Sequence, residues 1–271
     1  MKNLFHTEWL KIKNYRAFWW VMGITALTYP GINYIFLRVY NDFTQEKNEG
    51  AAVLKWLMGN PFAFPESWRT VGFFSSIFVF IPAIVIIMLV TNEFSFKTCR
   101  QNIIDGWSRN QFMKAKLADV IILSAIVTVL YALVAFVIGL VSTDSAIADK
   151  WKLSYYVGLF ALQSFSQLSI AFMVGMLVRK AFISLAVFVF YFLIAEPIMV
   201  GYSKVKLNDI GRWLPLEISD RLLPMPAFMA RIDQESYNNA LRSVNYHVIY
   251  TIILIIITWA FSFWIFNRRD I

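Results

Sequence analysis

Long apolar blocks that are almost free of charge dominate this sequence of 271 residues. Each block covers about the 20 residues that an α-helix needs to cross roughly 30 Å of hydrocarbon. Lipid offers no hydrogen-bond partners, so a spanning segment must be a helix or part of a closed barrel. Barrel strands alternate apolar and polar side chains, whereas these blocks are apolar on every side. The sequence therefore predicts an all-α integral membrane protein.

Six blocks are long enough to span the bilayer. Only 15% of the residues are charged, against about a quarter in a typical globular domain, and most of the charges fall between the blocks. The six spans are expected at Ala17–Val39, Thr70–Asn92, Ala115–Leu140, Ser154–Val178, Ala181–Tyr202 and Val244–Phe266. Only Arg179 and Lys180 separate the fourth and fifth spans, so these two spans should form a tight hairpin. We expect a single transmembrane domain over residues 1–271.

The distribution of basic residues predicts the orientation. If the N-terminus is inside, the inner segments are residues 1–16, 93–114, 179–180 and the tail from Asn267, with Lys116 at a span edge. These segments hold 13 of the 25 Lys and Arg but only four of the 17 acids. This is the positive-inside pattern, which places both ends in the cytoplasm (N-in/C-in). It also accounts for the net charge of +8 without a nucleic-acid partner.

Two segments outside the spans carry apolar residues that need cover. Residues 1–16 are expected to form an N-terminal interfacial helix with Phe5, Trp9 and Ile12 on one stripe. The segment 203–243, before the last span, is too apolar for a solvated loop, and prolines interrupt it. Short outer re-entrant helices, covered by protein, are the expected solution.

A carboxylate in the fifth span is the main candidate for a substrate contact or a gate. Glu196 would cost about 2.5 kcal/mol or more if charged at a helix centre, which makes it a functional candidate. Pro197 follows it, frees a backbone carbonyl and could hinge the span. The alternative is that Glu196 lies near the outer end and pairs with Lys204 or Lys206. The apolar path past this site is expected to include Phe80 and Phe190.

The inner loop between the second and third spans is the most informative segment. Residues 91–117 read TNEFSFKTCRQNIIDGWSRNQFMKAKL, a basic stretch in which Ile103 and Ile104 would be exposed unless a partner covers them. A short basic helix with an apolar pair at its tip can dock in a groove of a soluble partner. An ordinary inner loop that follows the positive-inside rule is the alternative.

Two acids at the edges of this loop are expected to hold it in place. Glu93 closes the second span and would anchor the loop through Arg100 or Lys97. Asp119 lies one turn into the third span and would pair with Lys116 or Lys114.

In these residues the sequence resembles the ABC-2 permease family, the transmembrane subunits of bacterial ATP-binding-cassette exporters. Members typically carry a Glu at the end of the second span, a Thr-x-Arg, a Pro-x-Ser-Arg and a Lys that opens the third span. The matching residues here are Glu93, Thr98, Arg100, Gly106-Trp107-Ser108-Arg109 and Lys116. Gly106 replaces the proline, and Lys97 replaces the glycine often found before the threonine. The start, Glu8-Trp9-Leu10-Lys11-Ile12-Lys13, is similar to the E-x-x-K-x-K entry helix of small bacterial members.

The resemblance implies a type V exporter fold in which three segments have separate roles. Segment 97–108 would be a coupling helix seated in a cleft of a separate ATPase, residues 1–16 a connecting helix, and residues 207–230 an outer gate. The implied coupling residues are Glu93, Thr98, Arg100, Ile103, Ile104, Asp105, Ser108 and Arg109. The implied connecting-helix residues are Glu8, Trp9, Lys11 and Lys13.

The resemblance also implies the partners and the location. ATP and Mg would bind to the partner ATPase, present in two copies, and no cofactor or metal is expected in this chain. A second permease copy, expected as a homodimer, would complete the path across the bacterial cytoplasmic (inner) membrane.

Two other functions stay open beside an exporter of an apolar or amphipathic substrate. One is a membrane anchor or sensor that the same ATPase drives without a transported molecule. The other is an intramembrane hydrolase, for which Ser203 and His247 would be the nucleophile and the base. The sequence has no G-x-x-x-x-G-K-[ST] motif, so ATP hydrolysis is expected in another chain, and this chain is not expected to be an enzyme.

Overall fold

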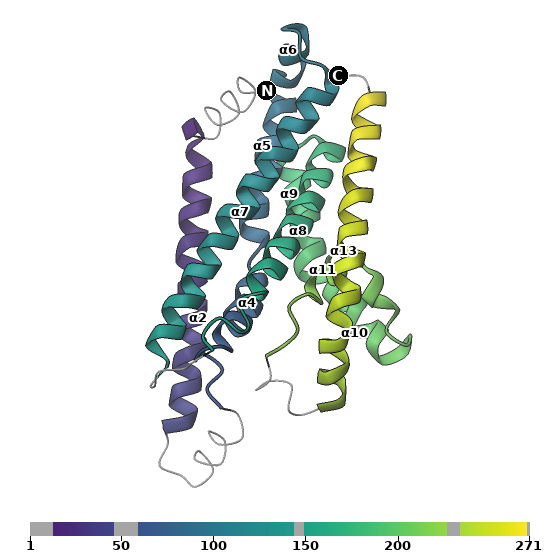
Figure 1. The fold of residues 1–271 in the computed structure, drawn as a ribbon. Coiled ribbons are helices and arrows are strands. Elements are labelled where there is room, and N and C mark those ends of the chain that lie inside the picture. Colours follow the sequence, from purple (N-terminus) through teal and green to yellow (C-terminus); the bar gives the residue numbers. More distant parts are fainter. Residues whose placement is uncertain (1–12, 46–58, 144–148, 227–233, 270–271) are drawn as a thin grey trace.

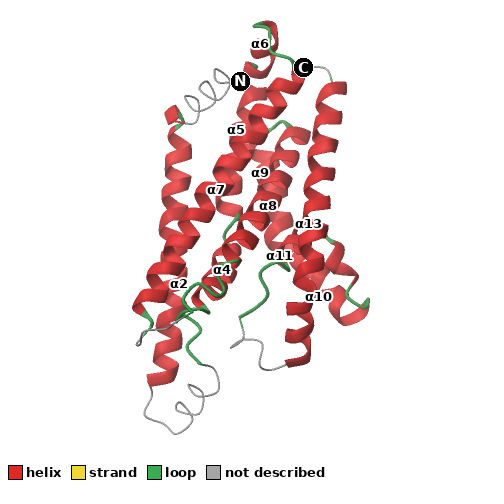
Figure 2. Ribbon diagram, viewed as in Figure 1, coloured by secondary structure: helices red, strands yellow, loops and turns green. Residues whose placement is uncertain are grey.

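The computed structural model describes residues 13–45, 59–143, 149–226 and 234–269, and within these ranges all regular structure is helical (Figure 2). Four segments are long and apolar enough to cross a membrane. They are α7 (Arg109–Val141), α8 (Tyr156–Val178), the continuous segment Ala181–Lys206, and Tyr237–Arg268 within α13 (Gln234–Arg268). The prediction of an all-helical chain with several membrane-length apolar helices is confirmed.

The remaining described helices are shorter, or less apolar, than these four. They are α2 (Arg16–Gln45), α4 (Ser67–Ser76), α5 (Phe80–Ser95), α6 (Thr98–Ile104), η2 (Ile210–Trp213) and α11 (Pro215–Asp220). The segment Ala181–Lys206 itself divides into α9 (Ala181–Phe190), the π-helical turn η1 (Tyr191–Ala195) and α10 (Glu196–Lys206). With 30 residues, α2 is long enough to span, but its Trp, Tyr, Thr and Asn side chains make it less apolar than the four.

The second predicted span, Thr70–Asn92, is not one straight helix. It consists of α4 and α5, which are bent by 48° at the break between Ser76 and Phe80. Pro82 lies just after the break and has no N–H to donate to the Phe78 carbonyl. That carbonyl accepts instead from the N–H of Ile81 at 3.1 Å, three residues on. This tighter turn explains a bend that the apolar pattern alone did not predict.

Helix α8 lies at the centre of the bundle and packs against α4, α5, α7, α9, α11 and α13 (Figure 1). The start of α2, the short helix α6 and the end of α13 lie at one end of the bundle (Figure 1), which we call the α6 end. The opposite end holds the end of α10 and the turn that leads to η2 (Figure 1). We call it the α11 end, because α11 packs on α8 and α13 toward this side.

Glycines allow α4 and the segment before it to approach α7 closely. A Cβ atom on Gly139 of α7 would lie 2.5 Å from Cζ of Phe64 and 2.7 Å from Oγ of Ser67. A Cβ on Gly72 of α4 would lie 3.1 Å from the hydroxyl of Tyr131. Small residues at helix contacts let the backbones come together, which is a main source of packing energy in lipid.

This packing predicts that Gly139→Ala lowers the thermal stability of the purified protein. The added methyl group would overlap an aromatic ring, and overpacking costs about 1–3 kcal/mol. Gly23→Ala in α2 is the matched control, since nothing lies within 4 Å of its Cβ position. The melting temperature in detergent should fall for the first variant only; equal melting temperatures would contradict the close approach.

Candidate functional site

A short hairpin at the α6 end connects α5 to α7. The segment 97–108 contains α6, a seven-residue helix. It begins after Lys97, whose φ is 56°, and the chain turns again at Gly106, whose φ is 103°. Left-handed backbone is unfavourable for a residue with a Cβ, so the conformation at Lys97 must be held by its surroundings.

A buried ionic network holds this hairpin. The ammonium of Lys116 on α7 donates to Oε1 of Glu93 at 3.0 Å and to Oδ2 of Asp119 at 3.3 Å. The hydroxyl of Thr98, at the first position of α6, donates to the other carboxylate oxygen of Glu93 at 2.6 Å. All three charged side chains are about 95% buried. The network therefore joins α5, α6 and α7 through one cation.

Of the two pairings expected for Glu93 and Asp119, one is confirmed and one is wrong. Pairing of Asp119 with Lys116 is confirmed, as the spacing of one helical turn requires. Pairing of Glu93 with Arg100 or Lys97 is wrong. Those two side chains are exposed, whereas Lys116 reaches Glu93 from the neighbouring helix.

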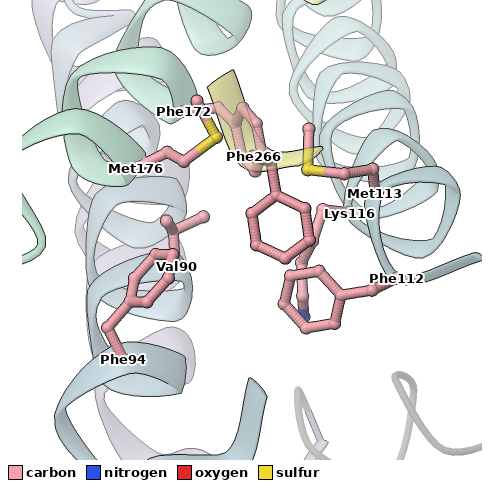
Figure 3. Close-up of a pocket in the computed structure, with 8 residues that line it drawn as sticks. All are labelled: Val90, Phe94, Phe112, Met113, Lys116, Phe172, Met176 and Phe266. Carbon is pink, nitrogen blue, oxygen red and sulfur yellow. The ribbon is translucent and has the colours of Figure 1, made fainter. Parts of the chain in front are cut away.

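The cation of this network is packed in an apolar shell. Figure 3 shows Lys116 among side chains from α5, α7, α8 and α13, with the rings of Phe112 and Phe266 close beside it. These rings are stacked at 5.2 Å. The space between the side chains is only about 10 Å³, which is room for at most one water molecule. This region is thus a packed junction rather than a ligand site.

Two further motif residues fix helix ends. Ser108 and Gln111 form a reciprocal capping box at the start of α7. The guanidinium of Arg109 donates to the carbonyls of Phe266, Asn267 and Arg269 at 3.2, 2.7 and 2.9 Å. These are orphan carbonyls at the negative end of α13, where a cation is stabilising. Arg109 thereby ties the α6 hairpin to the last helix.

The exposed part of the hairpin is smaller than the sequence suggested. Ile104 is 75% exposed, but Ile103 packs partly buried against the core, so the expected exposed pair is wrong for Ile103. Phe96, before α6, is 74% exposed and was missed, although it lies in the same inner loop, beyond the end of the predicted span. Phe96, Arg100, Ile104 and Asp105, all exposed, form what we call the α6 apex.

The first helix of the sequence prediction lies mostly outside the described residues. This applies to Glu8, Trp9 and Lys11, which were expected in a connecting helix. Lys13 is described and exposed, and its carbonyl accepts a hydrogen bond from the indole N–H of Trp19 at 2.9 Å.

A second carboxylate holds the short helix α11. Glu196 is 2% exposed, and its Oε1 accepts from the backbone N–H groups of Leu216 and Glu217 at 2.8 and 2.7 Å. The alternative of a solvated Glu196 that pairs with Lys204 or Lys206 is wrong. Lys204 lies 3.6 Å from Glu217 instead.

Glu196 follows the π-helical turn η1. Pro197 has no N–H to close the regular helical bond to the Leu193 carbonyl, and such local disturbance accommodates a π turn. The hinge expected at Pro197 therefore coincides with a real irregularity. Of the two expected path residues, Phe80 packs on Phe192 with ring centroids 5.6 Å apart, whereas Phe190 is 59% exposed.

A cavity of about 270 Å³ opens between α10 and α11. Glu196, Lys204, Glu217 and Asp220 line its polar side. One oxygen of Asp220 accepts from the side-chain amides of Gln163 and Gln167 on α8 at 2.7 and 2.6 Å. The sequence analysis missed these two glutamines, although their spacing of four residues places them on one face of α8.

An ion-pair cluster closes the α11 end. The guanidinium of Arg221 donates to both carboxylate oxygens of Asp209, at 2.8 and 2.7 Å, and to Glu217 at 2.8 Å. These hydrogen bonds hold the pKa of the Asp209 carboxyl below its usual range, against the effect of burial. The bidentate pair joins the turn before η2 to the end of α11.

The two residues considered for hydrolysis have structural partners. The hydroxyl of Ser203 donates to the Val200 carbonyl and accepts from the N–H of Gly211, both at 2.9 Å. His247 Nδ1 lies 3.1 Å from the Ile218 carbonyl. Each side chain positions a short helix of the segment 207–226, Ser203 at η2 and His247 at α11.

A family model described as a protein of unknown function (DUF2705) matches residues 51–271. No curated protein matches the chain. The match covers most of the chain, including the α6 hairpin, η2 and α11.

The ionic network predicts a large loss of stability in Lys116→Met. This change leaves two buried carboxylates without their shared cation, and breaking a buried pair costs about 3–5 kcal/mol. Lys114→Met is the matched control, because Lys114 is exposed on the same helix. Thermal unfolding in detergent should separate the two variants by many degrees; similar curves would show that the cation is dispensable.

The second carboxylate predicts a local effect in Glu196→Leu. The amides of Leu216 and Glu217 would lose their acceptor, so α11 should open more readily. Hydrogen exchange followed by mass spectrometry should show faster exchange over residues 215–220. In Glu196→Gln one acceptor oxygen remains, and exchange there should stay near that of the parent; equal exchange in the Leu and Gln variants would contradict the capping role.

Proposed function

The chain belongs to the DUF2705 family, whose function is unknown, and from its geometry we propose that it is the permease subunit of an ATP-driven exporter. ATP and Mg bind to two copies of a separate ATPase at the α6 end. A second permease copy completes the path, and the substrate is apolar or amphipathic. The membrane is the bacterial cytoplasmic membrane. The single observation that carries the proposal is the rigidly held, exposed α6 apex.

The proposed topology has six spans with both ends in the cytoplasm. Beside the four membrane-length apolar segments, α2 and the bent pair α4–α5 serve as the first and second spans. The start of α2, the α6 hairpin and the end of α13 share one end of the bundle (Figure 1), as an even number of crossings requires. The excess of basic residues in the corresponding segments supports placing that end inside.

The α6 apex is suited to take up force from a soluble partner. Its exposed apolar side chains, Phe96 and Ile104, would be removed from water by contact with a partner, which is favourable. The buried network of Glu93, Lys116 and Asp119 fixes its base, so a displacement of α6 moves α5 and α7 as well. ATP-driven closure of the partner subunits thereby biases one packing of the helices over another, which is the physical content of coupling.

A second connection leads from α6 to the re-entrant segment. Arg109 binds the end of α13, and α13 runs the length of the bundle to His247, which meets the Ile218 carbonyl of α11. Glu196 on α10 holds the other side of α11. In the proposed cycle, α11 and η2 act as the outer gate. Residues 227–230 of the expected gate lie outside the described residues.

The resemblance to ABC-2 permeases gains support from the contacts of its motif. Thr98 and Lys116 both donate hydrogen bonds to Glu93, which gives a reason for the joint presence of the three residues at this spacing. Lys97, where members often have glycine, adopts a φ that glycine takes most readily. At Gly106 the φ of 103° is one that proline cannot adopt, so this chain turns differently from members that have the proline.

The proposal predicts that Ile104→Asp releases the ATPase. An acidic side chain in the contact would be buried without a partner on docking, which is costly. The full chain would be purified with an affinity tag from its native membrane, and co-purified ATP hydrolysis measured. Loss of at least about tenfold is expected, the effect of 1.4 kcal/mol of binding energy.

Val141→Asp is the matched control, because Val141 is 73% exposed and Ile104 is 75% exposed, at opposite ends of the bundle. It should retain the hydrolysis. If the parent protein carries no nucleotide-hydrolysing companion, or if both variants retain it equally, the exporter proposal fails. Transport by Glu196→Gln, with the ATPase still bound, then separates a gate from an anchor that moves no substrate.

A further inference from the structure

A second large cavity lies at the α6 end, between the α5–α6 connection and the α8–α9 turn. Its volume is about 360 Å³, within the range of about 300–1,000 Å³ that is usual for small-molecule sites. It differs from the packed junction around Lys116, which has no such room. The two connections that form it are adjacent only in the folded chain.

The cavity is strongly basic. Of the described residues that line it, four are basic, Lys97, Arg100, Arg179 and Lys180, and one is acidic, Glu93. That acid accepts hydrogen bonds from Lys116 and Thr98. Basic side chains therefore outnumber acidic ones in the described lining by four to one.

Two of these cations are held in unfavourable backbone conformations. Lys97 has a φ of 56° and Arg179 a φ of 59°, which is the left-handed region that residues with a Cβ rarely adopt. Both residues end a helix and line the same cavity. Strained positions that persist are often part of ligand clamps. Burial, together with repulsion from Arg269, lowers the pKa of Arg179 below its usual value.

The cavity also has an apolar side. Phe94 and Val178 line it, and the guanidinium of Arg179 lies 4.8 Å from the centre of the Phe94 ring. Immediately after Lys180, the face of α9 presents Phe182, which is 84% exposed. A ligand with a negative head group and an apolar tail matches this arrangement of a basic surface beside an apolar one. A free anion would contact only the basic surface.

We propose that this cavity binds the phosphate group of an anionic phospholipid, with its acyl chains along α9. Basic pockets between transmembrane helices take up such head groups. The bound phosphate would join the two connections and neutralise their mutual repulsion. The site requires neither the ATPase nor a transported substrate, so it stands apart from the proposed function.

The test uses the full-length chain in a neutral detergent, with phosphatidylglycerol, phosphatidylcholine or inorganic phosphate added. Phosphatidylglycerol should raise the melting temperature, and the other two should not. The double variant Lys97→Gln/Lys180→Gln should bind phosphatidylglycerol at least about tenfold more weakly, since each lysine near a lipid surface contributes about a fivefold effect. The matched control is Lys152→Gln/Lys206→Gln, two exposed lysines outside the cavity, which should bind like the parent.

A second variant, Lys97→Gly, keeps the test decisive if the double variant Lys97→Gln/Lys180→Gln fails to fold. Glycine relieves the strained backbone, so this variant should be at least as stable as the parent without lipid, yet gain less from phosphatidylglycerol. Native mass spectrometry would count the bound lipid directly.

Three results would overturn the proposal. The first is an equal response of both double variants to phosphatidylglycerol. The second is the same shift with inorganic phosphate alone, which would make the site one for a free anion. The third is unchanged lipid binding in Lys97→Gln/Lys180→Gln together with loss of a co-purified ATPase, which would assign the cavity to an acidic protein surface.

Discussion

One buried ammonium group organises the α6 end of this protein. Lys116 on α7 neutralises Glu93 on α5 and Asp119 on its own helix, and Thr98 completes the shell of Glu93. A charge in such a place is tolerable only while its partners stay in position, because the desolvation cost is large. The three helices therefore move together or the network breaks. This rigidity is what makes a seven-residue helix, too short to be stable alone, a firm element on the surface.

The two ends of the bundle use the same device in different forms. At the α6 end, Glu93 lies near the end of α5 and holds α6 through the Thr98 hydroxyl. At the α11 end, Glu196 lies in the long apolar segment Ala181–Lys206 and holds α11 through two backbone amides. A carboxylate on a long helix is thus the support of a short helix in both cases. The long helices α8 and α13 lie between them, and the cap that Arg109 places on α13 gives the two ends a continuous physical connection.

Periodicity and charge were enough to predict the long apolar helices, the tight α8–α9 hairpin and the pairing of Asp119 with Lys116, because each depends on local spacing. Other features depend on tertiary contacts that one sequence does not reveal. Glu93 bonds to Lys116, 23 residues away, rather than to the cations beside it. Ile103 is covered by the core and its neighbour Ile104 is not. The backbone amides that donate to Glu196 lie 20 and 21 residues further along the chain. The composition of the intervening segment does not determine how the chain returns to Glu196.

The basic cavity and the α6 apex share Arg100, and this has a mechanical consequence. Lys97 and Arg100 line the cavity, while Arg100 also belongs to the α6 apex. A phosphate held between the α5–α6 connection and the α8–α9 turn would restrain the same hairpin that the proposed ATPase displaces. If the cavity changes width during that displacement, the lipid favours one width, and by linkage the ATPase alters lipid affinity to the same extent. Anionic lipid would then shift the equilibrium between two packings of the helices, in addition to forming the bilayer around them.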